Sequence, residues 1–177
     1  AALKRHQDKV VMHLGGSTLT GGEVAEQMSR YVQAFEALGA GTGTAGALLA
    51  LNRPEVLFII GSGQTQGFRR TSLHPLGSAD DHAYVINDAG ITTLIIDPYF
   101  TERALALLEK CPGLTQVLTI GPPPAELVAA CETSGRACHD LVATAATFEA
   151  QPLVAKVLPP DHIVSITYTG GTTGKPK

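Results

Sequence analysis

The stretch from Ile91 to Ile96 reads Ile-Thr-Thr-Leu-Ile-Ile, with β-branched residues at five of its six positions. Such side chains fit the pleated surface of a sheet, so this stretch is the strongest strand signal in the chain. Asp97-Pro98 follows directly and ends the strand, because proline has no N–H to give to a sheet ladder. A strand is therefore expected near the middle of the chain.

Strands and helices are expected to alternate on both sides of it. Further strands are predicted over Thr44 to Leu51, Arg69 to Leu73, Val117 to Ile120 and Ile163 to Tyr168. Helices are predicted over Pro54 to about Gly67, from Ser78 to just before Gly90, over Thr101 to Lys110 and over Ala125 to about Ser134. This alternation implies right-handed crossovers and an α/β fold with a mostly parallel sheet flanked by helices.

The N-terminal region adds a small β-hairpin. Val10 to Thr20 reads as two short strands joined at Gly15-Gly16, a pair that can take the positive φ of a tight turn. Thr20 and Glu23 then form a T-x-x-E capping box, which predicts a helix that ends at Gly39.

Two later helices carry start signals of their own. Ser78 and Asp81 form a second capping box, and Asn52 is expected to cap the helix entered through Pro54. The stretch from Ala137 to Pro160 gives no clear element. We expect residues 1–160 to form an N-terminal α/β subdomain and residues 161–177 to be a strand and loop that open a further section.

Composition limits the function classes. Apolar residues make up 44% of the chain and charged residues 16%, so it folds, and its net charge of -3 provides no general field for nucleic acid. No apolar run approaches the roughly 18 residues of a membrane span, so no transmembrane segment is expected, and peripheral membrane contact stays open. Three cysteines without a C-x-x-C pair favour a reducing, cytoplasmic location and no metal site.

Gly41 to Gly46 matches G-x-G-x-x-G, which in a dinucleotide-binding oxidoreductase follows a strand and opens a helix. Here the motif follows a predicted helix and opens a strand. We therefore interpret it as a helix end and turn, and the oxidoreductase hypothesis is disfavoured.

The stretch from Tyr168 to Lys177 has the composition of a phosphate-binding loop. It follows a predicted strand, and its consecutive glycines, threonine hydroxyls and Lys175 can converge on an anion. It is not a Walker A loop, because Pro176 stands where that loop has the Ser or Thr that holds magnesium. A flexible tail is the structural alternative.

This stretch resembles the phosphate-loop signature of the adenylate-forming superfamily, whose acyl-CoA synthetases carry Tyr-Thr-Ser-Gly-Thr-Thr-Gly-Lys-Pro-Lys. Nine of ten positions agree, and Gly170 replaces the usual Ser. Upstream, Asn52 to Glu55, Arg70 to Ser78 and Ile91 to Pro98 also resemble the N-terminal region of fatty-acyl-CoA synthetases. The resemblance covers nearly the whole chain but only about the first third of such an enzyme.

The resemblance implies the N-terminal portion of an enzyme that activates a carboxylic acid, expected to be a fatty acid, with ATP to acyl-AMP and then transfers it to coenzyme A. The expected cofactors of the whole enzyme are ATP, Mg²⁺ and coenzyme A. Its partners are the small-molecule carboxylate, ATP and CoA. It implies phosphate contacts from the loop, namely Thr169, Gly170, Gly171, Thr172, Thr173, Gly174 and Lys175. The magnesium, adenine and catalytic-lysine positions would lie beyond Lys177, so no catalytic or metal residue is assigned and the chain alone is expected to be inactive.

Two alternatives stay open: a ligase that loads its acyl-AMP onto a carrier protein, and a non-catalytic interaction domain of the same fold. The oligomeric state is open as well. Other polar residues receive structural interpretations: Arg69-Arg70 as an exposed pair at a strand edge rather than a CoA phosphate site, and Asp80-Asp81 as partners of a helix start. No catalytic triad is expected at His74, His82 or His139, because none of them has a nucleophile and an acid close by in the sequence.

Overall fold

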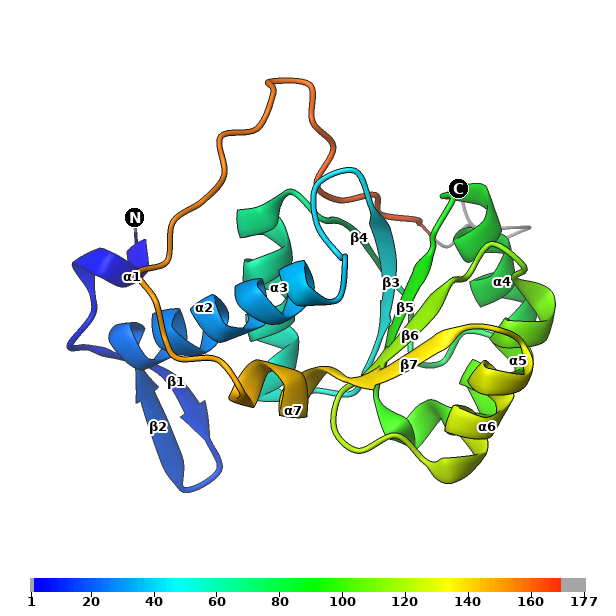
Figure 1. Cartoon of the computed structure of the whole chain (residues 1–177). Helices are drawn as coiled ribbons and strands as arrows, with labels where there is room; N and C mark the ends of the chain where they lie inside the picture. The colour runs from blue at the N-terminus through cyan, green and yellow to red at the C-terminus, as the bar shows by residue number, and fades with distance from the viewer. Residues whose placement is uncertain (1, 170–177) are drawn as a thin grey trace.

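The computed structural model describes residues 2–169 and shows an α/β fold built on a five-stranded parallel sheet (Figure 1). The strand order is β4-β3-β5-β6-β7, and every neighbouring pair is parallel. The predicted fold class is confirmed. The strand bounds are β3 Ala45–Leu49, β4 Arg69–Ser72, β5 Thr93–Ile96, β6 Gln116–Thr119 and β7 Ala137–Asp140.

Helices cover both faces of the sheet. Figure 1 shows α2, α3 and α7 on one side and α4, α5 and α6 on the other. The helix bounds are α1 Ala2–Arg5, α2 Gly21–Ala37, α3 Pro54–Gln66, α4 Ala79–Asp88, α5 Thr101–Lys110, α6 Ala125–Thr133 and α7 Leu141–Ala146, with the 3-10 turn η1 at Pro98–Phe100. No helix among residues 2–169 is long and apolar enough to cross a membrane.

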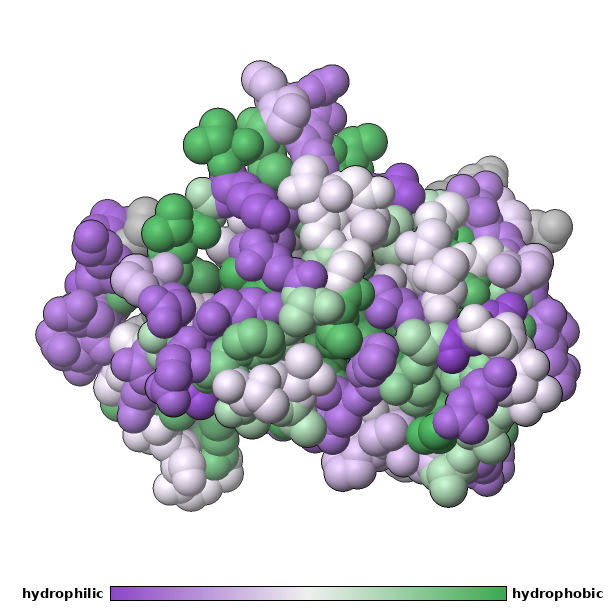
Figure 2. Space-filling model, viewed as in Figure 1, coloured by the Kyte–Doolittle hydropathy of each residue, from purple (hydrophilic) through white to green (hydrophobic). Residues whose placement is uncertain are grey.

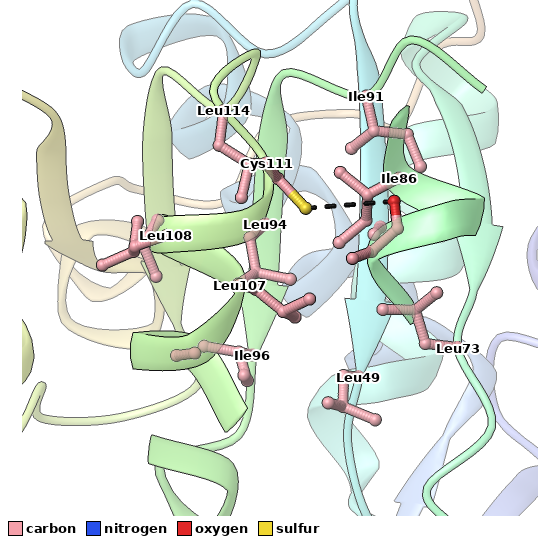
Figure 3. Packing of buried hydrophobic residues seen from close by; sticks show 14 of the residues in the cluster. Leu49, Leu73, Ile86, Ile91, Leu94, Ile96, Leu107, Leu108, Cys111 and Leu114 are labelled. Carbon is pink, nitrogen blue, oxygen red and sulfur yellow. Dashed lines mark hydrogen bonds between the residues drawn. The ribbon is translucent and has the colours of Figure 1, made fainter. Parts of the chain in front are cut away.

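The sheet separates two hydrophobic layers. Leu94 and Ile96 of β5 pack with α4 and α5 on one face, whereas Ile95 packs with α2 and α3 on the other. Figure 3 shows the first layer, in which Leu107 of α5 lies beside Leu94 and Ile96 of β5. Successive side chains of β5 point to opposite faces of the sheet. Because helices cover both faces, consecutive residues of this strand must be apolar.

The hairpin and the first capping box are confirmed. β1 Val10–Leu14 pairs antiparallel with β2 Ser17–Thr20, and Gly15 has a φ of 59° in the turn. The Thr20 hydroxyl accepts a hydrogen bond from the Glu23 amide at 3.2 Å, and the Glu23 carboxylate accepts from the Thr20 amide at 2.7 Å. The bond from the Thr20 amide to the Glu23 carboxylate, and a second one from the Thr20 hydroxyl at 3.0 Å, favour the charged form and lower the pKa of Glu23.

The second capping box is also confirmed, but the cap expected for α3 is wrong. Ser78 and Asp81 exchange hydrogen bonds of 3.0 and 3.2 Å at the start of α4. The N-cap of α3 is Arg53, which makes no side-chain capping bond, rather than Asn52. Proline forces the residue before it into extended backbone, so Arg53 becomes the boundary residue and Asn52 lies one position too early.

The C-terminal part differs most from expectation. The unread stretch after residue 136 forms β7 and α7. The strand expected over Ile163 to Tyr168 is wrong: among the described residues this segment makes one isolated parallel bridge, between Ser165 and Arg70. The Arg70 amide donates to Val164 and the Arg70 carbonyl accepts from Ile166, both at 3.1 Å. One residue of the edge strand β4 thus holds the segment, which is too little for a continuous ladder.

Candidate functional site

The segment that leads into the predicted phosphate loop is held against α4. The Tyr168 hydroxyl donates to Asp88 Oδ2 at 2.5 Å, and Asp88 is the last residue of α4. Burial, followed by this bond to a carboxylate, raises the pKa of Tyr168 to about 12. Tyr168 therefore stays a protonated donor at neutral pH and fixes the chain directly before Thr169.

Thr169 is exposed and is the one predicted phosphate contact that the structure describes. The other six lie outside the described residues: Gly170, Gly171, Thr172, Thr173, Gly174 and Lys175. Their role in phosphate binding stays a prediction.

A hollow of about 500 Å³ lies beneath this segment, at the edge of the sheet where the strands begin. His162 Nε2 lies 2.8 Å from the Gly67 carbonyl oxygen, and Arg69 donates to the Ala89 carbonyl oxygen at 2.6 Å. The first contact holds the segment around His162 to the end of α3. The second holds the start of β4 to the end of α4. The lining residues are Gly43, Thr44, Gly67, Arg69, Pro159, Asp161, His162 and Ile163.

Arg69 and Arg70 do not match the exposed pair that the sequence suggested, because both are half-buried. The Arg70 guanidinium contacts the Ser72 hydroxyl, and burial lowers its pKa. Residues 161–169 cover the outer side of β4, which explains the burial. These residues are far from β4 in the sequence, so the burial of the two arginines could not be predicted from the residues around them.

The strands end at the opposite edge of the sheet, where Arg53 joins three of them. Arg53 itself follows β3. Its Nη1 donates a hydrogen bond of 2.9 Å to the carbonyl oxygen of Ile120, which follows β6, and lies 3.3 Å from Oδ2 of Asp97, which follows β5. Its Nε lies 3.3 Å from Glu55 Oε2. Burial alone would lower the pKa of Arg53, but Glu55 and Asp97 outweigh it and raise the pKa.

This edge includes the point where ligands bind in many open α/β sheets, because the chain leaves β3 and β5 in opposite directions there. Here Arg53 and Asp97 form an ion pair. Sequence reasoning missed this pair. The sequence indicated it only in that Arg53 and Asp97 each follow an apolar predicted strand.

The remaining candidates take structural roles. Thr44 Oγ1 bonds the Gly41 amide and carbonyl at 2.8 Å, so the G-x-G-x-x-G stretch is a turn before β3, as expected. Asp81 caps α4, and Asp80 pairs with Lys110 at 2.9 Å.

His82 is buried between two helices. Its Nε2 lies 2.8 Å from the His74 carbonyl oxygen, and its Nδ1 lies 3.0 Å from Arg103 Nη1. These partners are a carbonyl and a guanidinium rather than a nucleophile and a carboxylate, so the geometry does not form a triad at His82.

The thiols are poorly placed for chemistry. Cys111 and Cys131 are buried and Cys138 is half-buried. Burial raises the pKa of all three, to about 11 for Cys111 and about 12 for Cys138. Among residues 2–169, no group of three or more His, Cys, Asp and Glu side chains could hold a metal ion.

Two named relatives align with most of this chain. The medium/long-chain-fatty-acid–CoA ligase FadD8 of Mycobacterium tuberculosis is 62% identical over 178 residues, which cover 99% of this chain and 30% of that protein. The 3-hydroxybenzoate–CoA ligase of an Aromatoleum species is 26% identical over 163 residues, 92% of this chain and 29% of that protein. The chain thus spans about 30% of the length of these relatives.

Solved structures share the fold. The adenylation domain of a carboxylate reductase from Mycobacterium chelonae superposes with a TM-score of 0.80 at 19% identity, over 91% of this chain and 27% of that one. The anthranilate–CoA ligase AuaEII with anthranoyl-AMP gives 0.77 at 20% identity, over 98% and 32%. The amide bond synthetase McbA from Marinactinospora thermotolerans gives 0.72 at 27% identity, over 92% and 30%.

The family model described as AMP-binding enzyme matches residues 1–177, the whole of the chain. Its match agrees with the resemblance carried by the Tyr168 to Lys177 stretch. The chain therefore belongs to the AMP-binding enzyme family.

Proposed function

We propose that this chain is the N-terminal portion of an ATP-dependent acid–thiol ligase that converts a fatty acid to acyl-AMP and then to acyl-CoA. The observation that carries the proposal is the 62% identity to a medium/long-chain-fatty-acid–CoA ligase across 99% of the chain. That relative also favours CoA over a carrier protein as the acceptor. We place the reaction in the cytoplasm, since the free cysteines fit a reducing compartment.

In this proposal the loop that begins at Thr169 holds the β- and γ-phosphates of ATP. Pyrophosphate gains charge as it leaves, so fixed donors at that point stabilise the transition state more than the ground state. The hydroxyls, backbone N–H groups and Lys175 supply these donors. Mg²⁺ would add further positive charge and would need carboxylate or water oxygens that this loop does not supply. Gly170 offers one hydroxyl fewer than Ser would.

Lys175→Ala in the whole ligase tests the loop. We expect a loss of at least tenfold in fatty-acid-dependent ATP–pyrophosphate exchange, because one charge-assisted phosphate contact contributes about 1.5–3 kcal/mol. Lys156→Ala is the matched control, since Lys156 pairs with Glu36 on the surface. Equal exchange in the two variants would remove the loop from the reaction.

The 177-residue chain alone should show no exchange, since the other groups that the reaction needs are proposed to follow Lys177. ATP–pyrophosphate exchange by the isolated chain would contradict the proposal that these groups follow Lys177. A thermal shift with NAD but not with ATP or pyrophosphate would favour the oxidoreductase hypothesis instead.

A further inference from the structure

A cavity of about 660 Å³ lies on the α2 and α3 face of the molecule, between those helices, α1 and the segment 152–155. In Figure 1 this segment runs past α1 on its way from α7 to the C-terminal region. The volume is in the range of small-molecule sites, which are mostly apolar and carry a few polar groups. None of the residues that line it is among the predicted phosphate contacts.

The walls are mainly apolar. The apolar lining residues are Ala2, Leu3, Ala25, Met28, Pro152, Leu153, Val154 and Ala155, with Gly22 and Gly61 between them. Gly61 lets Met28 lie directly on α3, because a Cβ at position 61 would come within 2.2 Å of Met28 Cε. Met28 is largely buried and forms part of the wall. A chain of methylene groups is the ligand that such a surface favours.

The charge that lines the cavity is positive. Lys4 is the sole charged residue among the described residues that line the cavity, and its ammonium makes no ion pair within residues 2–169. Gln7, Gln64 and Thr65 add polar groups to the same lining. In the space-filling view, hydrophobic side chains of this face lie next to the hydrophilic N-terminal segment (Figure 2). An apolar body with one anionic head complements this arrangement, whereas a cationic head is repelled by Lys4.

We propose that this cavity binds a medium-chain fatty-acid carboxylate, with its alkyl chain along α2 and α3 and its head at Lys4. A polyphosphate would need several donors and would gain nothing from the apolar walls. The Tyr168–Asp88 contact involves α4, which lies on the other face of the sheet from this cavity.

Calorimetric titration of the 177-residue chain with monomeric octanoate, decanoate and dodecanoate tests the proposal. We expect saturable one-to-one binding that strengthens about fourfold per added methylene. Dodecanol should bind about tenfold more weakly than dodecanoate, and dodecyltrimethylammonium more weakly still. Equal affinity for the cationic and anionic amphiphiles, or no saturation, would overturn the proposal.

Four variants locate the site. Lys4→Met keeps the aliphatic stem and removes the charge, and should weaken dodecanoate binding about tenfold, whereas Lys9→Met, outside the lining, should leave it unchanged. Ala25→Leu adds bulk to the wall, narrows the cavity and should weaken dodecanoate binding. Val154→Asp changes a side chain that is 73% exposed, so the fold is retained while an acid opposes the carboxylate.

Circular dichroism melting confirms that each variant is folded. Unchanged dodecanoate binding in folded Val154→Asp or Lys4→Met would refute the assignment. Binding to phosphatidylglycerol vesicles without saturable binding of monomeric dodecanoate would assign the face to a membrane surface and also overturn it. None of these readouts depends on ligase activity, so failure here is distinct from failure of the proposed function.

Discussion

Arg53 shows how much a single side chain can do that local sequence does not reveal. Its guanidinium binds acceptors that follow β5 and β6, and its own position follows β3. Asp97 is 6% exposed and relies on Arg53 and on the Tyr99 amide, which donates to Oδ1 at 3.0 Å. A buried carboxylate without its cation is costly, so the pair matters most when one partner is missing.

Arg53→Met should lower the free energy of unfolding by about 1–3 kcal/mol, because it leaves Asp97 with one partner. Urea unfolding at pH 7 measures this. The double variant with Asp97→Asn should recover part of the loss, since the uncompensated charge is then gone. A double variant as unstable as the sum of the two single variants would show that the residues act independently.

His82 gives the fold a pH dependence. Burial, with Arg103 nearby, lowers its pKa, although the His74 carbonyl opposes the shift. The unfolded chain therefore takes up a proton near pH 6.5 while the folded chain does not. Stability is full above that pH and falls, by at most about 1.4 kcal/mol per unit, as the pH drops toward the folded pKa.

His82→Gln should remove this slope between pH 7 and 5.5, because the amide can serve both neighbours without titrating. Urea unfolding measures the free energy of unfolding of both proteins at the two pH values. The contribution of the other histidines is the same in both proteins, so it cancels when the two changes with pH are subtracted. Asp81, whose pKa is lowered chiefly by Ser78, contributes at lower pH and is retained in both. An identical slope in the two proteins would contradict the assignment.

At the scale of elements, the helix starts could be predicted where a short-range hydrogen bond fixes them. α2 and α4 begin where their capping boxes indicated. β7 was invisible because Ala-Cys-His-Asp has no strand character of its own and becomes a strand by pairing with β6. Ile163 to Tyr168 shows the reverse, since strand propensity there finds only Arg70 as a ladder partner among the described residues.

Ser78→Ala should cost α4 about 1 kcal/mol of unfolding free energy, because the Asp81 amide loses its acceptor. Chemical denaturation detects a change of this size. Ser17→Ala is a suitable control, as Ser17 is exposed at the start of β2 and should change stability by less than about 0.5 kcal/mol. Equal losses would mean that the cap contributes nothing particular.

At the scale of the whole molecule, both hydrophobic layers share β5. Leu94 and Ile95 are adjacent and fully buried, yet they belong to different layers. Loss of either layer exposes a face of the same strand, so the layers are expected to unfold together. The alternation of strands and helices along the chain predicted a sheet covered by helices on both faces. The Arg53–Asp97 contact could not be predicted, because it needs strand ends that come from distant parts of the chain.

Leu94→Ala and Ile95→Ala should each lower stability by about 2–5 kcal/mol while unfolding remains a single transition. Far-UV circular dichroism and tyrosine fluorescence should give coincident curves. Val157→Ala, at a side chain that is 99% exposed, should change stability by less than about 0.5 kcal/mol. Separate transitions in either core variant would show that the layers are independent units.

The burial of the three cysteines has a practical consequence for spectroscopy. With thiol pKa values raised to about 11 and 12 at Cys111 and Cys138, few thiolates exist at neutral pH to react with a maleimide. A cysteine introduced at the exposed Thr169 would therefore be labelled first in the otherwise unaltered chain. If the stretch after Thr169 binds ATP as we propose, a dye at this position should change its fluorescence when ATP is added.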